Sequence, residues 1–259
     1  MSKVLLVTGG ATGIGAAVAT LGAQRGWTVA ICDVNESVGS ALAEQLGGRF
    51  IHCDVTNLAS VCAAVDECER ELGVPNYAHL NAGIMTVPTG DSYLAIEDVS
   101  QAQYRKIVGV NLDGVYHGAK TLIPKMRACG GAITITASTA GLTMVPVDPM
   151  YTATKYAVIG FGRAVAAAEA VTAAIPRQVD TWSRSPLQVI AHLHVVAARG
   201  FDRDDARGRP RDTDEVVDPL HIGLIPPVTD ISPRFDALAT VLTRPTQAPA
   251  VLVAAIAHG

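Results

Sequence analysis

The sequence has little charge of either sign and no long apolar run. Charged residues make up 17% of the 259 residues and the formal net charge is -4, so nothing favours binding to nucleic acid or to an anionic membrane. The apolar stretch at residues 4–7 is too short for a signal peptide or a membrane span, and no later stretch reaches about 18 apolar residues. We therefore expect a cytoplasmic protein with no nucleic-acid or membrane partner.

Cysteine and histidine patterns typical of disulfides or metal sites are also lacking. The cysteine count is odd, no CxxC pair occurs, and the chain is not a small secreted one. Reduced, mostly buried thiols are therefore expected at Cys32, Cys53, Cys62, Cys68 and Cys129. Only His192 and His194 are spaced closely enough to suggest a histidine ligand pair, and a structural role is the simpler interpretation. The sequence predicts no metal site.

Short apolar runs alternate with helical patterns through the first 170 residues. Strand patterns occur at residues 4–7, 28–32, 50–53, 77–80 and 132–136. Helical patterns occur at residues 14–25, 36–46, 58–72, 101–127 and 150–170. This alternation predicts a single α/β domain of the Rossmann-like kind, with a doubly wound, mostly parallel sheet and helices on both faces.

A glycine-rich turn, Thr8-Gly9-Gly10-Ala11-Thr12-Gly13-Ile14-Gly15, lies between the first strand and the first helix. Glycines here let the backbone approach a pyrophosphate, and the helix N-terminus supplies free N–H groups. The spacing G-x3-G-x-G differs from the commonest dinucleotide fingerprint, and a plain strand–helix turn is the alternative. The candidate cofactor-binding residues of this turn are Gly9, Thr12, Gly13, Ile14 and Gly15.

Asp33 ends the second strand, 18 residues after Gly15. An acid at this place meets the ribose hydroxyls of bound NAD and would repel the 2′-phosphate of NADP. We therefore expect NAD as the cofactor. The alternative is an aspartate that caps a helix or forms a turn.

Tyr151 and Lys155 are four residues apart, so they share one face of a helix. A tyrosine, with an ordinary pKa of about 10, acts as a base near neutral pH only with help, and a neighbouring ammonium favours the phenolate. Ser138 follows a strand, at the sheet edge where open α/β sheets bind ligands, and its hydroxyl would bind the reacting oxygen. Taken singly, these residues are also common as a surface pair and a turn serine.

Five motifs, in this order, resemble the short-chain dehydrogenase/reductase family. They are the turn at residues 8–15; Cys53-Asp54-Val55; Asn81-Ala82-Gly83, with Leu80 in place of the usual first asparagine; Asn111; and Ser138 with Tyr151-Thr152-Ala153-Thr154-Lys155. The resemblance covers about residues 3–170.

The resemblance implies roles for several residues. Asp54 and Val55 would lie near the adenine, and Asn81, Ala82 and Gly83 would border the cofactor. Lys155 would also hold the nicotinamide ribose, and Asn111 would bind a water that relays protons to Lys155. The catalytic set would be Ser138, Tyr151, Lys155 and Asn111. The two helices at about residues 101–127 and 150–170 would assemble a homodimer or homotetramer.

Residues 171–259 lack the Pro-Gly motif and the closing strand that the family has there. Residues 199–214 are nearly all polar and are expected to form a solvated loop. Two explanations stay open, namely true divergence and a shifted reading frame of a GC-rich gene. Three functions follow: an NAD-dependent oxidoreductase acting on a secondary alcohol or ketone, an NADPH-linked ketoreductase, and a catalytically impaired or non-catalytic dinucleotide-binding protein.

Overall fold

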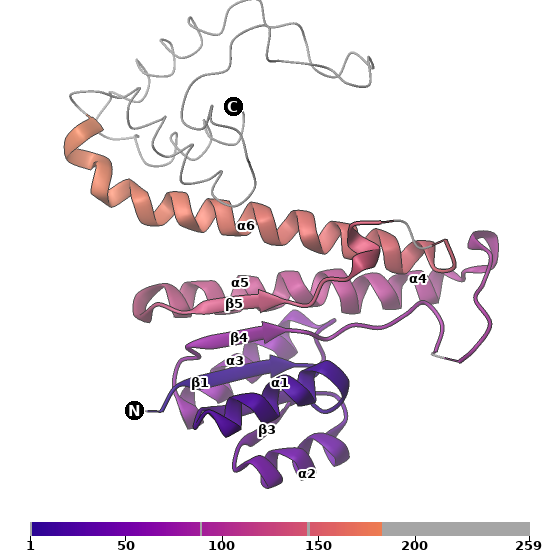
Figure 1. Cartoon of the computed structure of the whole chain (residues 1–259), viewed down its shortest axis with the longest axis horizontal. Helices are drawn as coiled ribbons and strands as arrows, with labels where there is room; N and C mark the ends of the chain where they lie inside the picture. The colour runs from indigo at the N-terminus through magenta and orange to yellow at the C-terminus, as the bar shows by residue number, and fades with distance from the viewer. Residues whose placement is uncertain (1, 89, 144–145, 183–259) are drawn as a thin grey trace, which may run out of the picture. The chain divides into compact units, whose positions relative to one another are not determined.

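The computed structural model describes residues 2–88, 90–143 and 146–182 (Figure 1). The chain divides into two compact units, Met1–Gly162 and Arg163–Gly259. Within the second unit the description ends at Trp182. The expectations for residues 199–214, for His192 and His194, and for the origin of the C-terminal third therefore lie outside the described residues. That the whole chain forms one domain likewise stays a prediction.

The first unit contains a five-stranded parallel sheet in the order β3-β2-β1-β4-β5 (Figure 1). The strands are β1 (Val4–Thr8), β2 (Thr28–Asp33), β3 (Arg49–His52), β4 (Tyr77–Leu80) and β5 (Ala132–Ile135). The chain first builds outward from β1 to β2 and β3, and then returns to place β4 and β5 on the other side of β1. The strand order reverses between β1 and β4, which is where open α/β sheets bind ligands.

The helices are α1 (Gly13–Gln24), α2 (Glu36–Leu46), α3 (Leu58–Leu72), α4 (Gln101–Val108), α5 (Gly114–Cys129) and α6 (Pro149–Trp182). Two sequence-based helices needed correction. The pattern at residues 101–127 is not one α-helix, because the π-helix Gly109–Asp113 separates α4 from α5. The helix predicted to end at residue 170 continues to Trp182, so its end does not coincide with the change in composition.

Apolar side chains of β1 alternate between the two faces of the sheet and so enter two cores. Leu6 belongs to the cluster formed with residues of α3, α5 and α6, whereas Leu5 and Val7 belong to the cluster formed with α1 and α2. All five residues of β1 are buried. The sheet is therefore covered on both faces, and the predicted doubly wound parallel architecture is confirmed.

Leu80, which departs from the family's pattern, is part of the first core. Its side chain is 2% exposed. A Cβ added at Gly118 of α5 would lie 2.5 Å from Leu80 Cδ2, so the missing side chain at Gly118 makes room for the leucine. The position is an apolar packing site in this chain, which explains why no asparagine is needed there.

The five cysteines are free thiols, as expected from their spacing. Cys32, Cys53 and Cys68 are buried, Cys62 is half-buried and Cys129 is exposed. Burial raises the pKa of the Cys53 and Cys68 thiols to about 12, and it raises that of Cys32 as well. These three thiols are held in the protonated, unreactive form.

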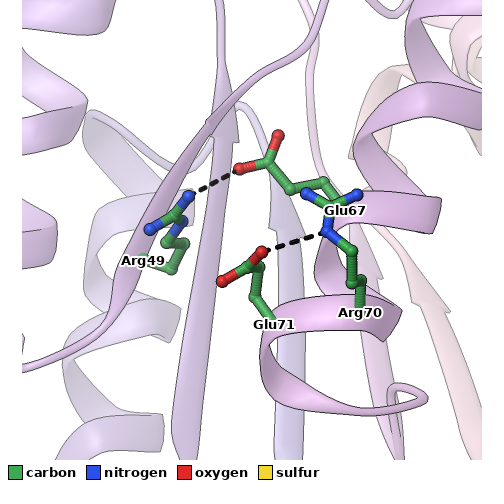
Figure 2. Close-up of polar contacts among 4 residues, drawn as sticks. All are labelled: Arg49, Glu67, Arg70 and Glu71. Carbon is green, nitrogen blue, oxygen red and sulfur yellow. Dashed lines mark hydrogen bonds and ion pairs between the residues drawn. The ribbon is translucent and has the colours of Figure 1, made fainter.

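Several ion pairs lie at the surface of α3, and among them Lys125 of α5 contacts Asp66 and Glu69 of this helix. Arg49 of β3 contacts Glu67 of α3 at 3.0 Å, and Arg70 contacts Glu71 at 3.0 Å (Figure 2). Such solvent-exposed pairs each contribute at most about 1 kcal/mol, so α3 is held mainly by its buried apolar face. Over the part of the chain that is described, no helix combines the length and apolar character needed to cross a membrane.

Candidate active site

The turn between β1 and α1 requires glycine at three positions, which are Gly9, Gly13 and Gly15. Gly9 and Gly13 have φ values of +61° and +55°, in the left-handed region that other residues rarely adopt. A Cβ at Gly15 would lie 2.1 Å from Gly9 O, and a Cβ at Gly9 would lie 2.8 Å from Ala82 Cα. Gly9 and Gly15 therefore have no room for a side chain, and Gly9 packs against the segment that follows β4.

The N-terminus of α1 is left open. Among the described residues no side chain caps it, although Asn35, Asn57 and Ser100 cap α2, α3 and α4. The residues of this end, Thr12, Gly13 and Ile14, are exposed. Free N–H groups and the positive end of the helix dipole at a tight glycine turn fit a pyrophosphate.

Asp33 lies beside this turn, half-buried at the end of β2. Its Oδ2 accepts a hydrogen bond of 3.0 Å from the N–H of Ala11, and its Oδ1 accepts one of 2.9 Å from the N–H of Asn35. Asn35 rather than Asp33 caps α2. Oδ1 thus bonds within its own turn, and Oδ2 bonds to the glycine turn. A carboxylate in this place suits a contact with the ribose of a dinucleotide.

Asp54 and Val55 follow β3 at the same edge of the sheet. Asp54 Oδ1 accepts hydrogen bonds from the N–H and the hydroxyl of Thr56 at 2.9 and 2.8 Å. Val55 is 7% exposed, and its carbonyl oxygen lies 2.9 Å from His117 Nδ1. Both residues are fixed by neighbours from α5 or from their own turn.

Asn81, Ala82 and Gly83 connect β4 to the glycine turn. The N–H groups of Asn81 and Ala82 donate to Thr8 Oγ1 at 3.0 and 3.4 Å. A Cβ at Gly83 would lie 3.4 Å from Lys155 Nζ. The segment therefore contacts both the end of β1 and Lys155.

Lys155 and Tyr151 come together on the first turns of α6. Lys155 is 3% exposed, and its Nζ donates a hydrogen bond of 2.9 Å to Thr136 O. The same Nζ lies 5.6 Å from the centroid of the Tyr151 ring. Burial lowers the pKa of Lys155. An amine held this way beside a half-buried tyrosine can share in the transfer of a proton.

Ser138 lies just beyond β5, at the start of the 3-10 helix Thr139–Gly141. Its Oγ accepts a hydrogen bond of 3.1 Å from the N–H of Ala140. The hydroxyl oxygen therefore already accepts a hydrogen bond from the backbone, and the hydroxyl proton can be donated to a substrate oxygen.

Asn111 is fully buried in the π-helix between α4 and α5. Its Oδ1 accepts from Ile84 N at 2.8 Å, and its Nδ2 donates to Ile84 O at 2.9 Å and to Thr154 Oγ1 at 3.1 Å. Thr154 Oγ1 in turn donates to Tyr151 O at 2.8 Å. The side-chain amide thus joins the segment after β4 to α6. That Asn111 also holds a relay water stays a prediction.

Asp148 is a site residue that the sequence analysis missed. It is 2% exposed and directly precedes Pro149, the first residue of α6. Oδ1 accepts from Tyr151 N at 2.9 Å and from Thr86 Oγ1 at 2.6 Å, while Oδ2 accepts from Thr86 N at 2.9 Å. The carboxylate therefore fixes the turn that carries Tyr151. An Asp-Pro pair is a helix-start signal, so the sequence held a clue to this role.

A small pocket borders the start of α6. Two polar residues, Thr86 and Asp148, contribute to it and bond to each other. Its other lining residues are Val87, Tyr93, Leu94, Val99, Val147, Pro149 and Met150. The pocket has a volume of about 10 Å³, which is enough for about one water molecule, so it is not by itself a substrate site.

Comparisons with known proteins place this geometry among oxidoreductases. The family model described as short chain dehydrogenase matches residues 3–182. The chain is 34% identical to zerumbone synthase of Zingiber zerumbet over 77% of each chain, and 35% identical to (+)-borneol dehydrogenase 1 of Salvia officinalis over 64% of this chain and 63% of the relative.

Solved structures are also similar to this chain in both fold and sequence. One example is a short chain dehydrogenase/reductase from Burkholderia phymatum in complex with NAD, with a TM-score of 0.59 and 30% identity. The match covers 64% of this chain and 59% of that one. The similar region is therefore about three fifths of that relative's length.

Proposed function

This chain belongs to the short-chain dehydrogenase family, and we propose that it transfers a hydride between NAD and a secondary alcohol or the corresponding ketone, with Tyr151 as the acid/base. The observation that carries the proposal is the placement of the buried Lys155 Nζ 5.6 Å from the ring centroid of Tyr151. The open N-terminus of α1 and the carboxylate of Asp33 beside it supply a matching dinucleotide site.

The residues divide the chemistry among them. Tyr151 exchanges a proton with the substrate oxygen, Ser138 donates a hydrogen bond to that oxygen, and Lys155 stabilises the phenolate. When bound, NAD supplies the hydride acceptor. In the family the lysine also holds the nicotinamide ribose, and the position of Gly83 next to Lys155 Nζ is consistent with that role.

Asp33 supports NAD over NADP. Its carboxylate is anchored to the glycine turn through Ala11 N–H, where it would meet a ribose hydroxyl and repel a 2′-phosphate. The relative from Burkholderia phymatum was solved in complex with NAD. The alternative is an NADPH-linked ketoreductase. Measuring activity with each of the two cofactors distinguishes it from an NAD-dependent enzyme.

The lining of the pocket beside α6 supports an apolar substrate. This lining is mostly apolar and its carboxylate is already paired, so an apolar surface borders the start of α6, although the pocket itself holds no more than about one water molecule. One relative is named for a dehydrogenase acting on borneol, an alicyclic alcohol. We therefore place secondary alicyclic alcohols and their ketones first among candidate substrates.

We also propose a cytoplasmic homo-oligomer assembled through α4, α5 and α6. Tyr104, Tyr116 and Tyr156 are 42%, 44% and 47% exposed on these three helices. Exposed aromatic rings are enriched at protein interfaces. Sedimentation of the purified chain should give a dimer or tetramer, and a monomer at micromolar concentration would contradict this part of the proposal.

The test of the function is a turnover screen of the full-length chain, with intact mass confirming its C-terminus. Secondary alcohols are offered with NAD and with NADP, and reduced nicotinamide is followed by absorbance. We expect turnover of at least one apolar alcohol, with NAD preferred. NAD binding without turnover of any alcohol would favour the non-catalytic alternative, and activity confined to NADP would favour the ketoreductase.

A further inference from the structure

A chain of polar side chains crosses one face of β4 and β5 and ends at the glycine turn. His79 Nδ1 lies 2.8 Å from Thr134 Oγ1, and His79 Nε2 lies 3.2 Å from Thr136 Oγ1. Thr136 Oγ1 donates to Asn81 Oδ1 at 2.9 Å, and Asn81 Nδ2 donates to Gly9 O at 3.1 Å. Four hydrogen bonds thus connect β5 to the first glycine of the turn.

The donor and the acceptor of each hydrogen bond in this series follow from its last group, the carbonyl oxygen of Gly9. Gly9 O can only accept, so Asn81 must present its NH₂ there and its Oδ1 to Thr136. The single hydroxyl proton of Thr136 is thereby used, and its oxygen must accept from His79 Nε2–H. Burial lowers the pKa of His79, so the ring is a neutral tautomer whose Nδ1 accepts from Thr134. Each link has one donor and one acceptor.

Thr136 also contacts Lys155, through its backbone. Thr136 O accepts the hydrogen bond from Lys155 Nζ at 2.9 Å, and Thr136 N donates to Leu80 O at 3.0 Å. The hydroxyl and the carbonyl of one residue therefore reach the glycine turn and the lysine. Gly9 O, at the far end, is closely confined on its other side, since a Cβ at Gly15 would lie 2.1 Å from it.

We propose that Thr136 is a positioning residue that couples the glycine turn to Lys155, with His79 orienting its hydroxyl. The proposal rests on the proposed function, in which the glycine turn binds the cofactor and Lys155 acts in catalysis. Its physical basis is preorganisation: a turn whose carbonyl is already fixed loses less freedom when a dinucleotide binds. No sequence motif marks Thr136 or His79, because threonine and histidine are ordinary residues in strands and have no characteristic spacing here.

The test compares matched variants of the full-length chain. Thr136→Val removes the hydroxyl but keeps the β-branched shape and the carbonyl that binds Lys155, whereas Thr136→Ser keeps the hydroxyl. Ile133→Val removes one methylene group from the opposite face of β5, outside this series of hydrogen bonds, and is the control for a general weakening of the strand. His79→Gln, whose amide can replace Nε2–H as a donor, and His79→Leu, which cannot donate, form a second pair.

We expect Thr136→Val to weaken NAD binding by roughly three- to tenfold in calorimetry, with kcat within about twofold of the parent. Thr136→Ser, Ile133→Val and His79→Gln should bind NAD like the parent, and His79→Leu should weaken binding in the same direction as Thr136→Val. In the cofactor-free chain, Thr136→Val and His79→Leu should speed hydrogen exchange in peptides that span residues 8–16, while the other three variants should not.

The exchange measurement separates the two proposals, because it needs no cofactor. If the parent bound neither NAD nor NADP, the proposed function would fail, and faster exchange at residues 8–16 in Thr136→Val, but not in Thr136→Ser or Ile133→Val, would still support the coupling. Unchanged exchange in both Thr136→Val and His79→Leu would overturn it. An equal effect of Ile133→Val would also overturn it, since the cause would then be a general weakening of β5.

Discussion

Asp33 Oδ2 accepts a 3.0 Å hydrogen bond from the backbone N–H of Ala11, so the carboxylate at the end of β2 is tied directly to the glycine turn. The bond joins residues 22 positions apart in sequence. Asp33 therefore contributes in two ways that can be tested separately, through its negative charge and through its hydrogen bond to the turn.

Two replacements separate these contributions. Asp33→Asn removes the charge and keeps one acceptor oxygen, which serves Ala11 N–H when the amide NH₂ is turned toward Asn35, whereas Asp33→Ala removes the charge and both acceptors. Each should relax the preference for NAD over NADP by roughly tenfold or more, because the repulsion of the 2′-phosphate is lost. Only Asp33→Ala should also weaken NAD itself through the lost turn contact. Dissociation constants for both cofactors check this, and a parent chain with equal affinities would rule out the placement of Asp33 at the ribose.

Tyr151→Phe should remove nearly all turnover and leave NAD binding largely intact. The backbone N–H bond to Asp148 does not involve the hydroxyl, so the start of α6 should keep its geometry. Loss of a general acid/base costs roughly 10²- to 10⁴-fold in kcat. Steady-state rates and calorimetry of the same preparation provide the measurement. The control is Tyr156→Phe, an exposed tyrosine on the same helix, which should behave like the parent. Normal turnover of Tyr151→Phe would assign the acid/base to another group.

Local chemistry explains why much of the fold could be predicted from the sequence. The bounds of α2, α3 and β4 agree with the predicted ranges. Asn35 and Asn57 cap the two helices through their side chains, and Gly47 ends α2 at a φ of +63°. These start and stop signals act within a few residues, so they are visible in the sequence. The glycine turn and the Tyr151–Lys155 pair are local in the same sense.

The contacts that were missed are long-range. Asp148 bonds to Thr86 across 62 positions, and Thr136 bonds to His79 across 57. No periodicity or spacing relates such residues, since the sheet order alone brings them together. The π-helix around Asn111 was missed for a related reason, because its amide is drawn to Ile84 and Thr154 from outside the helix.

Asp148→Asn should destabilise the protein and slow turnover together. The carboxylate accepts three hydrogen bonds with its two oxygens, and an amide would have to present its NH₂ to Thr86 or Tyr151. An unsatisfied buried donor costs about 1–3 kcal/mol. Urea unfolding should show that loss, and kcat should fall because Tyr151 shifts. Asn57→Ala, which removes the cap of α3 at a cost of about 1 kcal/mol, should leave kcat unchanged. A full kcat in Asp148→Asn would limit this residue to a structural role.

Acid should destabilise the native chain partly through His79. Burial lowers the folded pKa of His79 from its ordinary value of 6.5, so the unfolded chain takes up the proton first as the pH falls. The stability contributed by the neutral ring is fully present above pH 6.5 and is lost as the pH falls through the lower folded pKa. His79→Gln cannot titrate, so its free energy of unfolding should fall less than that of the parent between pH 8 and pH 5. Chemical unfolding at several pH values measures the difference. Tyr77→Phe, on the same face of β4, should keep the parent's pH dependence, and parallel curves for parent and His79→Gln would mean that His79 does not titrate differently on folding.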